Sequence, residues 1–115
     1  MLIFFVLEVH SAPKKFFTTS SFDAYLYLDS VKNVKYEITA FITFNIKNSS
    51  LISKPKFYSQ LISYECGQIN PTIIEELLAE KPYGKGEKVK DIKELKKAQK
   101  LVRSSYPALF KETCI

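Results

Sequence analysis

Hydrophobic and polar residues alternate most regularly between residues 35 and 47. One set of alternate positions is apolar and consists of Tyr36, Ile38, Ala40, Ile42, Phe44 and Ile46. The other set is mostly polar and consists of Lys35, Glu37, Thr39, Phe41, Thr43, Asn45 and Lys47. Because successive side chains of a strand point to opposite faces, this pattern predicts a strand with Ile38, Ile42 and Phe44 buried and its other face largely in water.

Two further segments have the composition of strands. Residues 22–28 are mostly aromatic and apolar, and residues 29–33 supply turn formers, so we expect residues 22–28 and 35–47 to pair as an antiparallel hairpin. Residues 2–9 are apolar on both faces, which is typical of a central strand. No basic residue precedes this run and Glu8 interrupts it, so we interpret it as a buried strand rather than a signal peptide.

Helical spacing is clearest in residues 91–104. Asp91 and Glu94 are placed to cap the first turn, and apolar residues recur at helical intervals. These apolar residues are Ile92, Leu95, Ala98, Leu101 and Val102. Tyr106 and Pro107 are expected to end the helix, after which Leu109 and Phe110 pack the tail onto the core.

Two earlier segments also match helical patterns. Asn70 is a good N-cap and Pro71 suits a first helical position, so the sequence predicts a helix from there to about Lys81. Residues 57–65 are ambiguous, because their apolar residues cover one helical face while their composition favours a strand. We favour a helix over 57–65 and keep a fourth strand as the alternative.

The order of these elements defines the predicted fold class. Strands come first and helices last, which indicates an α+β fold rather than a parallel βαβ sheet. We expect residues 1–115 to form a single globular domain, with residues 1–50 mainly in strands and residues 51–115 mainly in helices. The predicted architecture is an N-terminal antiparallel sheet of three or four strands with two or three C-terminal helices packed on it.

Charge is distributed unevenly along the chain. Residues 81–115 contain ten basic and four acidic residues, a net charge of plus six, whereas the first 80 residues have a net charge of minus one. Such a concentration predicts a positive surface that can neutralise phosphates of RNA or DNA. The candidate nucleic-acid-binding residues are Tyr83 as a stacking ring together with Lys85, Lys88, Lys93, Lys96, Lys97, Lys100 and Arg103. The alternative is a helix face that is basic only for solubility.

Residues with catalytic or metal-binding chemistry are few. His10 is the only histidine, which excludes a site with several His ligands within one chain. Cys66 and Cys114 fit no metal-binding spacing, so we predict two reduced thiols in a cytoplasmic protein and keep a disulfide as the alternative. The sequence indicates no cofactor, no metal and no membrane-spanning segment.

Three hypotheses about function follow from the sequence. The first is a small basic nucleic-acid-binding protein. The second is a protein-interaction or inhibitor module, which as a homodimer would pair through a strand edge or exposed aromatic residues. The third is a small phosphodiester-acting enzyme that uses His10 and a lysine, and it requires a dimer to bring two copies of the site together.

Overall fold

The computed structural model describes residues 13–47, 56–81 and 88–114. The strand predicted over residues 2–9 lies outside these ranges. The strands are β1 (Lys14–Thr18), β2 (Phe22–Leu26), β3 (Lys32–Val34), β4 (Glu37–Ile46), β5 (Lys56–Glu65) and β6 (Thr72–Ala79). The helices are the 3-10 turn η2 (Leu28–Ser30), α1 (Ile92–Val102), the 3-10 turn η4 (Arg103–Ser105) and α2 (Tyr106–Thr113).

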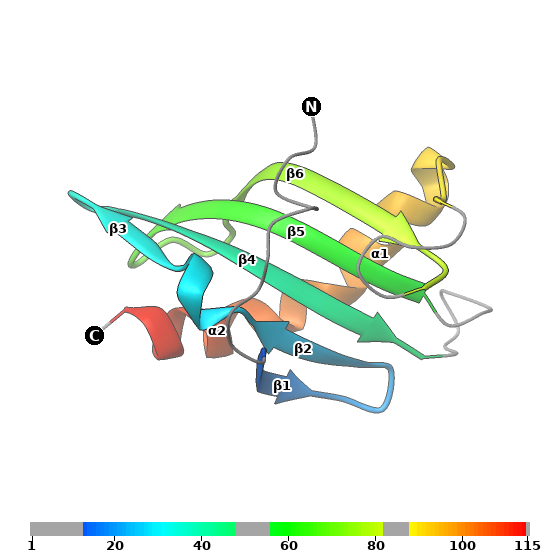
Figure 1. Cartoon of the computed structure of the whole chain (residues 1–115), viewed down its shortest axis with the longest axis horizontal. Helices are drawn as coiled ribbons and strands as arrows, with labels where there is room; N and C mark the ends of the chain where they lie inside the picture. Colours follow the sequence, from blue (N-terminus) through cyan, green and yellow to red (C-terminus); the bar gives the residue numbers. More distant parts are fainter. Residues whose placement is uncertain (1–12, 48–55, 82–87, 115) are drawn as a thin grey trace.

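The six strands of the described ranges form one antiparallel sheet in the order β1-β2-β4-β5-β6, with β3 paired to the start of β4 (Figure 1). The regular alternation of residues 37–46 is the reason for the central place of β4. Its inward residues, from Ile38 to Ile46, are all buried, while Glu37 and Lys47 are exposed. The predicted strand and its buried face are therefore confirmed, except at Tyr36, which lies beyond the strand and is 83% exposed. The other face is less exposed to water than predicted, because Thr39, Phe41, Thr43 and Asn45 are all partly buried.

The pairing of β2 with β4 is confirmed, but the connection between them is not the simple turn that the sequence predicts. It contains η2 and the short strand β3, which pairs with residues 37–39 of β4. Ser30 shapes this connection, because its hydroxyl donates to the Tyr27 carbonyl and accepts from the Phe41 amide at 2.9 Å. The tip of the β3–β4 hairpin is tight, and Lys35 there has a φ of 59°.

The predicted fold architecture is wrong in its second half. Residues 57–65 and most of residues 71–81 are the strands β5 and β6. The described part of the sheet therefore has six strands, and the helical segment, residues 92–113, is a single stretch of 22 residues. The molecule is a single compact domain, and its radius of gyration of 13.4 Å is the value expected for one domain of this length.

A β-bulge explains why β6 has the pattern of a helix. Leu61 pairs with Glu75 but the next residue, Ile62, pairs with Ile73, so Ile74 is an extra residue in β6. The residues of β6 that pair with inward positions of β5 are therefore 73, 76 and 78, a spacing that breaks the period of two. Ile73 and Leu78 take inward positions, whereas the extra residue Ile74 is apolar but 51% exposed, so the apolar residues of β6 do not alternate as those of a regular strand do.

The helical segment covers the inner face of the sheet, behind the strands in Figure 1. It does not end at Pro107, because proline is tolerated in the first turn of a helix and η4 leads directly into α2. Leu109 is buried and Phe110 packs against the core, as predicted. None of the helices in the described ranges is long and apolar enough to cross a membrane.

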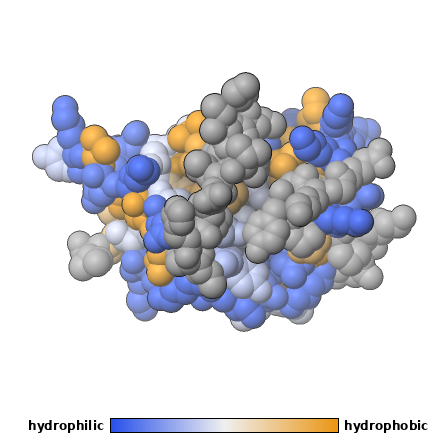
Figure 2. All heavy atoms as spheres, in the orientation of Figure 1, coloured by the Kyte–Doolittle hydropathy of each residue, from blue (hydrophilic) through white to orange (hydrophobic). Residues whose placement is uncertain are grey.

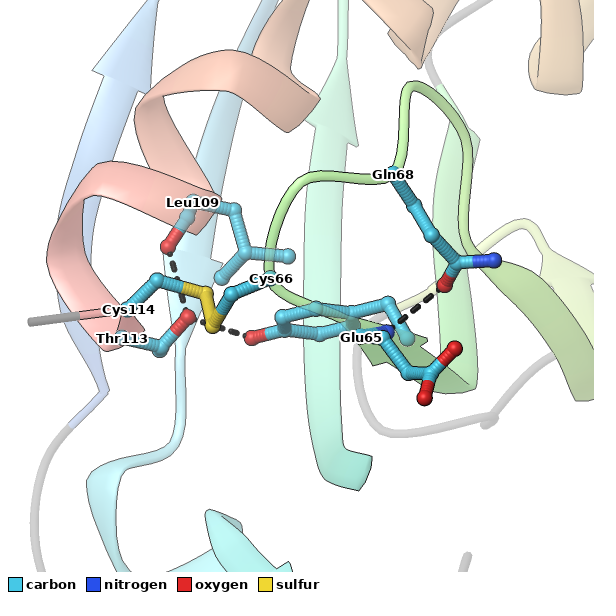
Figure 3. The surroundings of a disulfide bond; sticks show 7 residues. Glu65, Cys66, Gln68, Leu109, Thr113 and Cys114 are labelled. Carbon is cyan, nitrogen blue, oxygen red and sulfur yellow. Dashed lines mark hydrogen bonds between the residues drawn. A yellow bond between two sulfur atoms is a disulfide. The ribbon is translucent and has the colours of Figure 1, made fainter. Parts of the chain in front are cut away.

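Cys66 and Cys114 form a disulfide, so the prediction of two reduced thiols is wrong. Cys66 lies in the turn after β5, where Gly67 has a φ of 101°, and Cys114 directly follows α2 (Figure 3). The fold brings these positions together although they are 48 residues apart in the sequence. A hydrogen bond of 2.5 Å between the hydroxyls of Tyr64 and Thr113 lies beside the disulfide. The end of α2 is thus linked covalently to the sheet.

Candidate nucleic-acid interface

The basic residues predicted to bind nucleic acid lie mainly on α1, which begins as the sequence predicts. Asp91 is the N-cap, and its carboxylate accepts a hydrogen bond of 2.9 Å from the Lys93 amide. Asp91 and Glu94 place negative charge at the positive end of the helix dipole, and Lys100 places positive charge at its negative end. The helix termini are therefore well defined by local side chains.

Opposite faces of α1 have opposite character. Ala98 and Val102 are fully buried against the sheet, and Leu95 and Leu101 pack beside them. Five basic residues lie about half a helical turn away, on the face directed to solvent, and all are exposed. This set, which we call the basic face, consists of Lys93, Lys96, Lys97, Lys100 and Arg103. In Figure 2, hydrophilic atoms lie beside a few hydrophobic ones at the upper right, where α1 begins.

Few acidic groups neutralise the basic face. Glu94 lies 3.8 Å from Lys97, a loose contact between partly exposed groups. Among the described residues, Lys93, Lys96 and Lys100 form no ion pair within 4 Å. Exposed ion pairs of this kind contribute little energy, so Lys97 remains available to an external anion. The basic face therefore has an almost uncompensated positive charge.

Hydrogen bonds to the sheet fix the orientation of α1. Gln99 donates to both carboxylate oxygens of Glu76 on β6, at 2.8 and 2.9 Å. The same carboxylate accepts a hydrogen bond from the Tyr58 hydroxyl. Because these bonds involve the side of the helix next to the sheet, they hold the basic face outward.

A second group of polar side chains is buried beneath the helices. The Gln60 amide donates to the Tyr58 hydroxyl at 3.0 Å, and its oxygen accepts from the Tyr106 hydroxyl at 2.9 Å. Burial raises the pKa of both tyrosines, and the hydrogen bond to Glu76 raises the pKa of Tyr58 further. Every buried side-chain polar atom of the described residues has a partner. We interpret this network as structural, because each of its buried side-chain polar atoms already has a partner within the protein.

The structure describes only part of the predicted site. Lys88 is exposed and precedes α1, where its neighbour Val89 donates a backbone hydrogen bond to Leu78. It therefore adds to the positive charge at the start of the helix. Tyr83, Lys85 and His10 lie outside the described residues. Within the described ranges, no cluster of three or more His, Cys, Asp or Glu side chains is arranged to hold a metal ion.

Sequence reasoning did not single out one exposed end of the molecule. Tyr36 and Val34 at the β3–β4 hairpin are 83% and 69% exposed, and Ile69 after β5 is 84% exposed. A cleft of about 480 Å³ lies between the two loops. The alternation of residues 35–47 placed Tyr36 in the apolar set of the strand, although it is an aromatic residue close to the turn formers of residues 29–33.

No protein-family model, curated protein or solved structure matches this chain. The residues and their arrangement are therefore the basis for inferring its function.

Proposed function

We propose that this protein binds nucleic acid through the basic face of α1, by contacts to phosphates and without strong preference for base sequence. The observation that supports the proposal is the arrangement of the five exposed basic residues on one side of a helix whose opposite side is buried. Along the axis, Lys93 and Lys100 are separated by about 10 Å, since a helix rises about 1.5 Å per residue. Such a row follows several successive phosphates.

The composition of the basic face favours contact with phosphate over reading of bases. Four of its five residues are lysines, which act as compact point charges, whereas bidentate contact with guanine is best made by arginine. None of the residues of this face lines either of the two hollows that the structure describes. We therefore expect affinity to depend on charge and salt far more than on sequence.

The disulfide bears on where the protein works. A cytoplasmic location is the expectation from the sequence, but disulfides persist mainly in oxidising compartments. The Cys66–Cys114 bond therefore favours an oxidising compartment over the reducing cytosol. Binding through surface charge operates in either environment, because the basic face contains no thiol.

The salt dependence of binding tests the proposal. Fluorescence anisotropy with a labelled DNA duplex and with single-stranded RNA would measure the dissociation constant between about 50 and 200 mM salt, the range in which phosphate contacts are weakened strongly. If four residues each neutralise a phosphate, the affinity for duplex DNA falls roughly 150-fold over this range. The variant with Lys93, Lys96, Lys97 and Lys100 all replaced by alanine should lose most of the affinity and most of the slope.

A charge-matched variant separates the basic face from general positive charge. Replacing Lys14, Lys15, Lys32 and Lys111 by alanine removes the same number of charges from exposed positions outside α1. This variant should keep more than half of the salt slope. Equal losses in the two quadruple variants, or no binding of either nucleic acid at low salt, would refute the proposal.

A further inference from the structure

The end of the molecule opposite the start of α1 exposes an unusual amount of apolar surface. We call it the hairpin end and define it as residues 32–38 and 65–70. Glu37 and Glu65 face each other across β4 and β5, so the two loops next to them lie side by side. Three of the six exposed large hydrophobic residues of the described chain belong to this end, namely Val34, Tyr36 and Ile69. Figure 2 shows hydrophobic atoms among hydrophilic ones at the β3 tip.

A cleft lies directly beside the exposed tyrosine. It has a volume of about 480 Å³, within the range of clefts that accept ligands. Its lining comes from both loops and consists of Asn33, Lys35, Tyr36 and Ile38 on one side and residues 65–68 on the other. The hairpin end therefore presents a protruding aromatic ring next to a hollow that can receive one.

The loops around this cleft are held in place. The disulfide joins Cys66 to the end of α2, and the Glu65 amide donates to the Gln68 side chain at 2.6 Å (Figure 3). The adjoining hydrogen bond between Tyr64 and Thr113 fixes the end of β5. A partner at this end would therefore meet a surface that is already ordered, which lowers the entropic cost of association.

The charges of the hairpin end are balanced, unlike those of the whole chain. Two lysines, Lys32 and Lys35, accompany two glutamates, Glu37 and Glu65, whereas the chain has a net charge of plus five. Within the described residues none of the four forms an ion pair within 4 Å. The two glutamates are directly opposite each other in the sheet, an arrangement that costs energy unless a cation approaches.

These features are self-complementary, which points to one particular partner. We propose that the hairpin end is the interface of a homodimer with two-fold symmetry. Tyr36 of each copy enters the cleft of the other copy, and Lys35 of each copy pairs with Glu65 of the other. A two-fold axis makes both contacts occur twice, as an isologous interface requires. A polyanion or an anionic membrane fits this end less well, because the two glutamates would repel it.

The contact area is small, so the dimer is expected to be weak. Only three large apolar side chains per copy take part, which places the interface at the lower end of the size range for specific complexes. Exchange between monomer and dimer should therefore be fast, with a dissociation constant in the micromolar range. Salt should weaken the association, because the paired charges are at the rim.

Sedimentation equilibrium of the oxidised protein over a series of concentrations tests the interface. Tyr36→Ser should weaken dimerisation at least tenfold, because tyrosines commonly dominate the energy of an interface. Ile92→Ser is the matched control, since Ile92 is 67% exposed but lies at the start of α1. This control should dimerise like the natural protein.

Charge reversal makes the test specific to the proposed pairing. Lys35→Glu alone and Glu65→Lys alone should each weaken self-association at least tenfold, since each places like charges at two contacts. An equimolar mixture of the two variants should form a heterodimer at least tenfold tighter than either variant alone. Circular dichroism before each run confirms that the variants are folded.

Several results would overturn the inference. A natural protein that stays monomeric at concentrations up to about 1 mM would do so, because a dimer with micromolar affinity is well populated at that concentration. The same conclusion would follow if Tyr36→Ser and Ile92→Ser behaved alike, or if mixing the two charge variants restored nothing.

Discussion

Removal of the disulfide is the perturbation whose effect can be worked out most directly from the structure. The Cys66–Cys114 bond closes a loop of 48 residues, and loop-closure entropy predicts about 4 kcal/mol of stabilisation for a loop of that length. Domains of this size are typically stable by about 5–15 kcal/mol. The variant Cys66→Ala/Cys114→Ala should therefore fold but lose a large part of its stability.

Guanidinium chloride unfolding followed by circular dichroism measures the loss. With a slope of roughly 3 kcal/mol per molar denaturant for a chain of this length, the midpoint should fall by about 1.3 M. The slope should rise, because the unfolded chain expands when the cross-link is absent. Thermal unfolding should show a decrease of roughly 15 °C in Tm. Reduction of the natural protein should reproduce both shifts.

A second variant separates loop closure from the local contacts beside the disulfide. Thr113→Val removes the hydrogen bonds of the Thr113 hydroxyl with Tyr64 and with the Leu109 carbonyl but leaves the covalent bond, and it should cost only about 1–2 kcal/mol. A loss below about 1 kcal/mol in the double alanine variant, or equal losses in the two variants, would refute the entropic argument.

Three further predictions concern the core. Leu109→Ala should destabilise the protein by about 2–5 kcal/mol in urea, because Leu109 is fully buried, whereas Leu28→Ala, at a half-exposed site, should cost less than about 0.5 kcal/mol. Tyr106→Phe should cost about 1–3 kcal/mol, because it leaves the buried Gln60 oxygen without its donor, and equal stability would contradict the network. The raised pKa of Tyr58 and Tyr106 predicts stability that is intact below about pH 10 and falls as pH rises above it, by at most about 1.4 kcal/mol per pH unit for each tyrosine. Urea unfolding across the alkaline range would test this, and a flat profile would contradict it.

The parts of the fold that the sequence predicted are those in which one local rule acts alone. Every second residue from Ile38 to Ile46 is apolar without exception, because this face of β4 is covered by the helices. Asp91 marks the start of α1 because an N-cap is a contact within four residues. Such signals need no knowledge of the rest of the chain.

The parts that failed depend on contacts across the sheet. The bulge at Ile74 disturbs the period of β6, and its position is set by pairing with β5 rather than by β6 itself. Gln60 is a buried polar residue in β5, and only the hydroxyls of Tyr58 and Tyr106 make its burial acceptable. Tertiary pairing therefore outweighed the helical spacing of both segments.

The candidate site was partly accessible from the sequence. The concentration of charge singled out the lysines of residues 93–100 as candidates, and the structure has them exposed on the side of α1 away from its buried residues. The disulfide and the hairpin end were not accessible, because each joins segments that only the fold brings together. Tyr36 shows the limit most clearly, since alternation continues through residue 36 while the strand begins at Glu37.

The most direct test of the central claim is a titration of the isotope-labelled protein with single-stranded RNA, followed by amide chemical shifts. We predict that the largest shift changes occur at residues 93–103 and decrease when salt is raised from about 50 to 200 mM. Residues of the hairpin end should remain unchanged. Absence of shift changes at low salt, or changes centred on the sheet rather than on α1, would contradict the account.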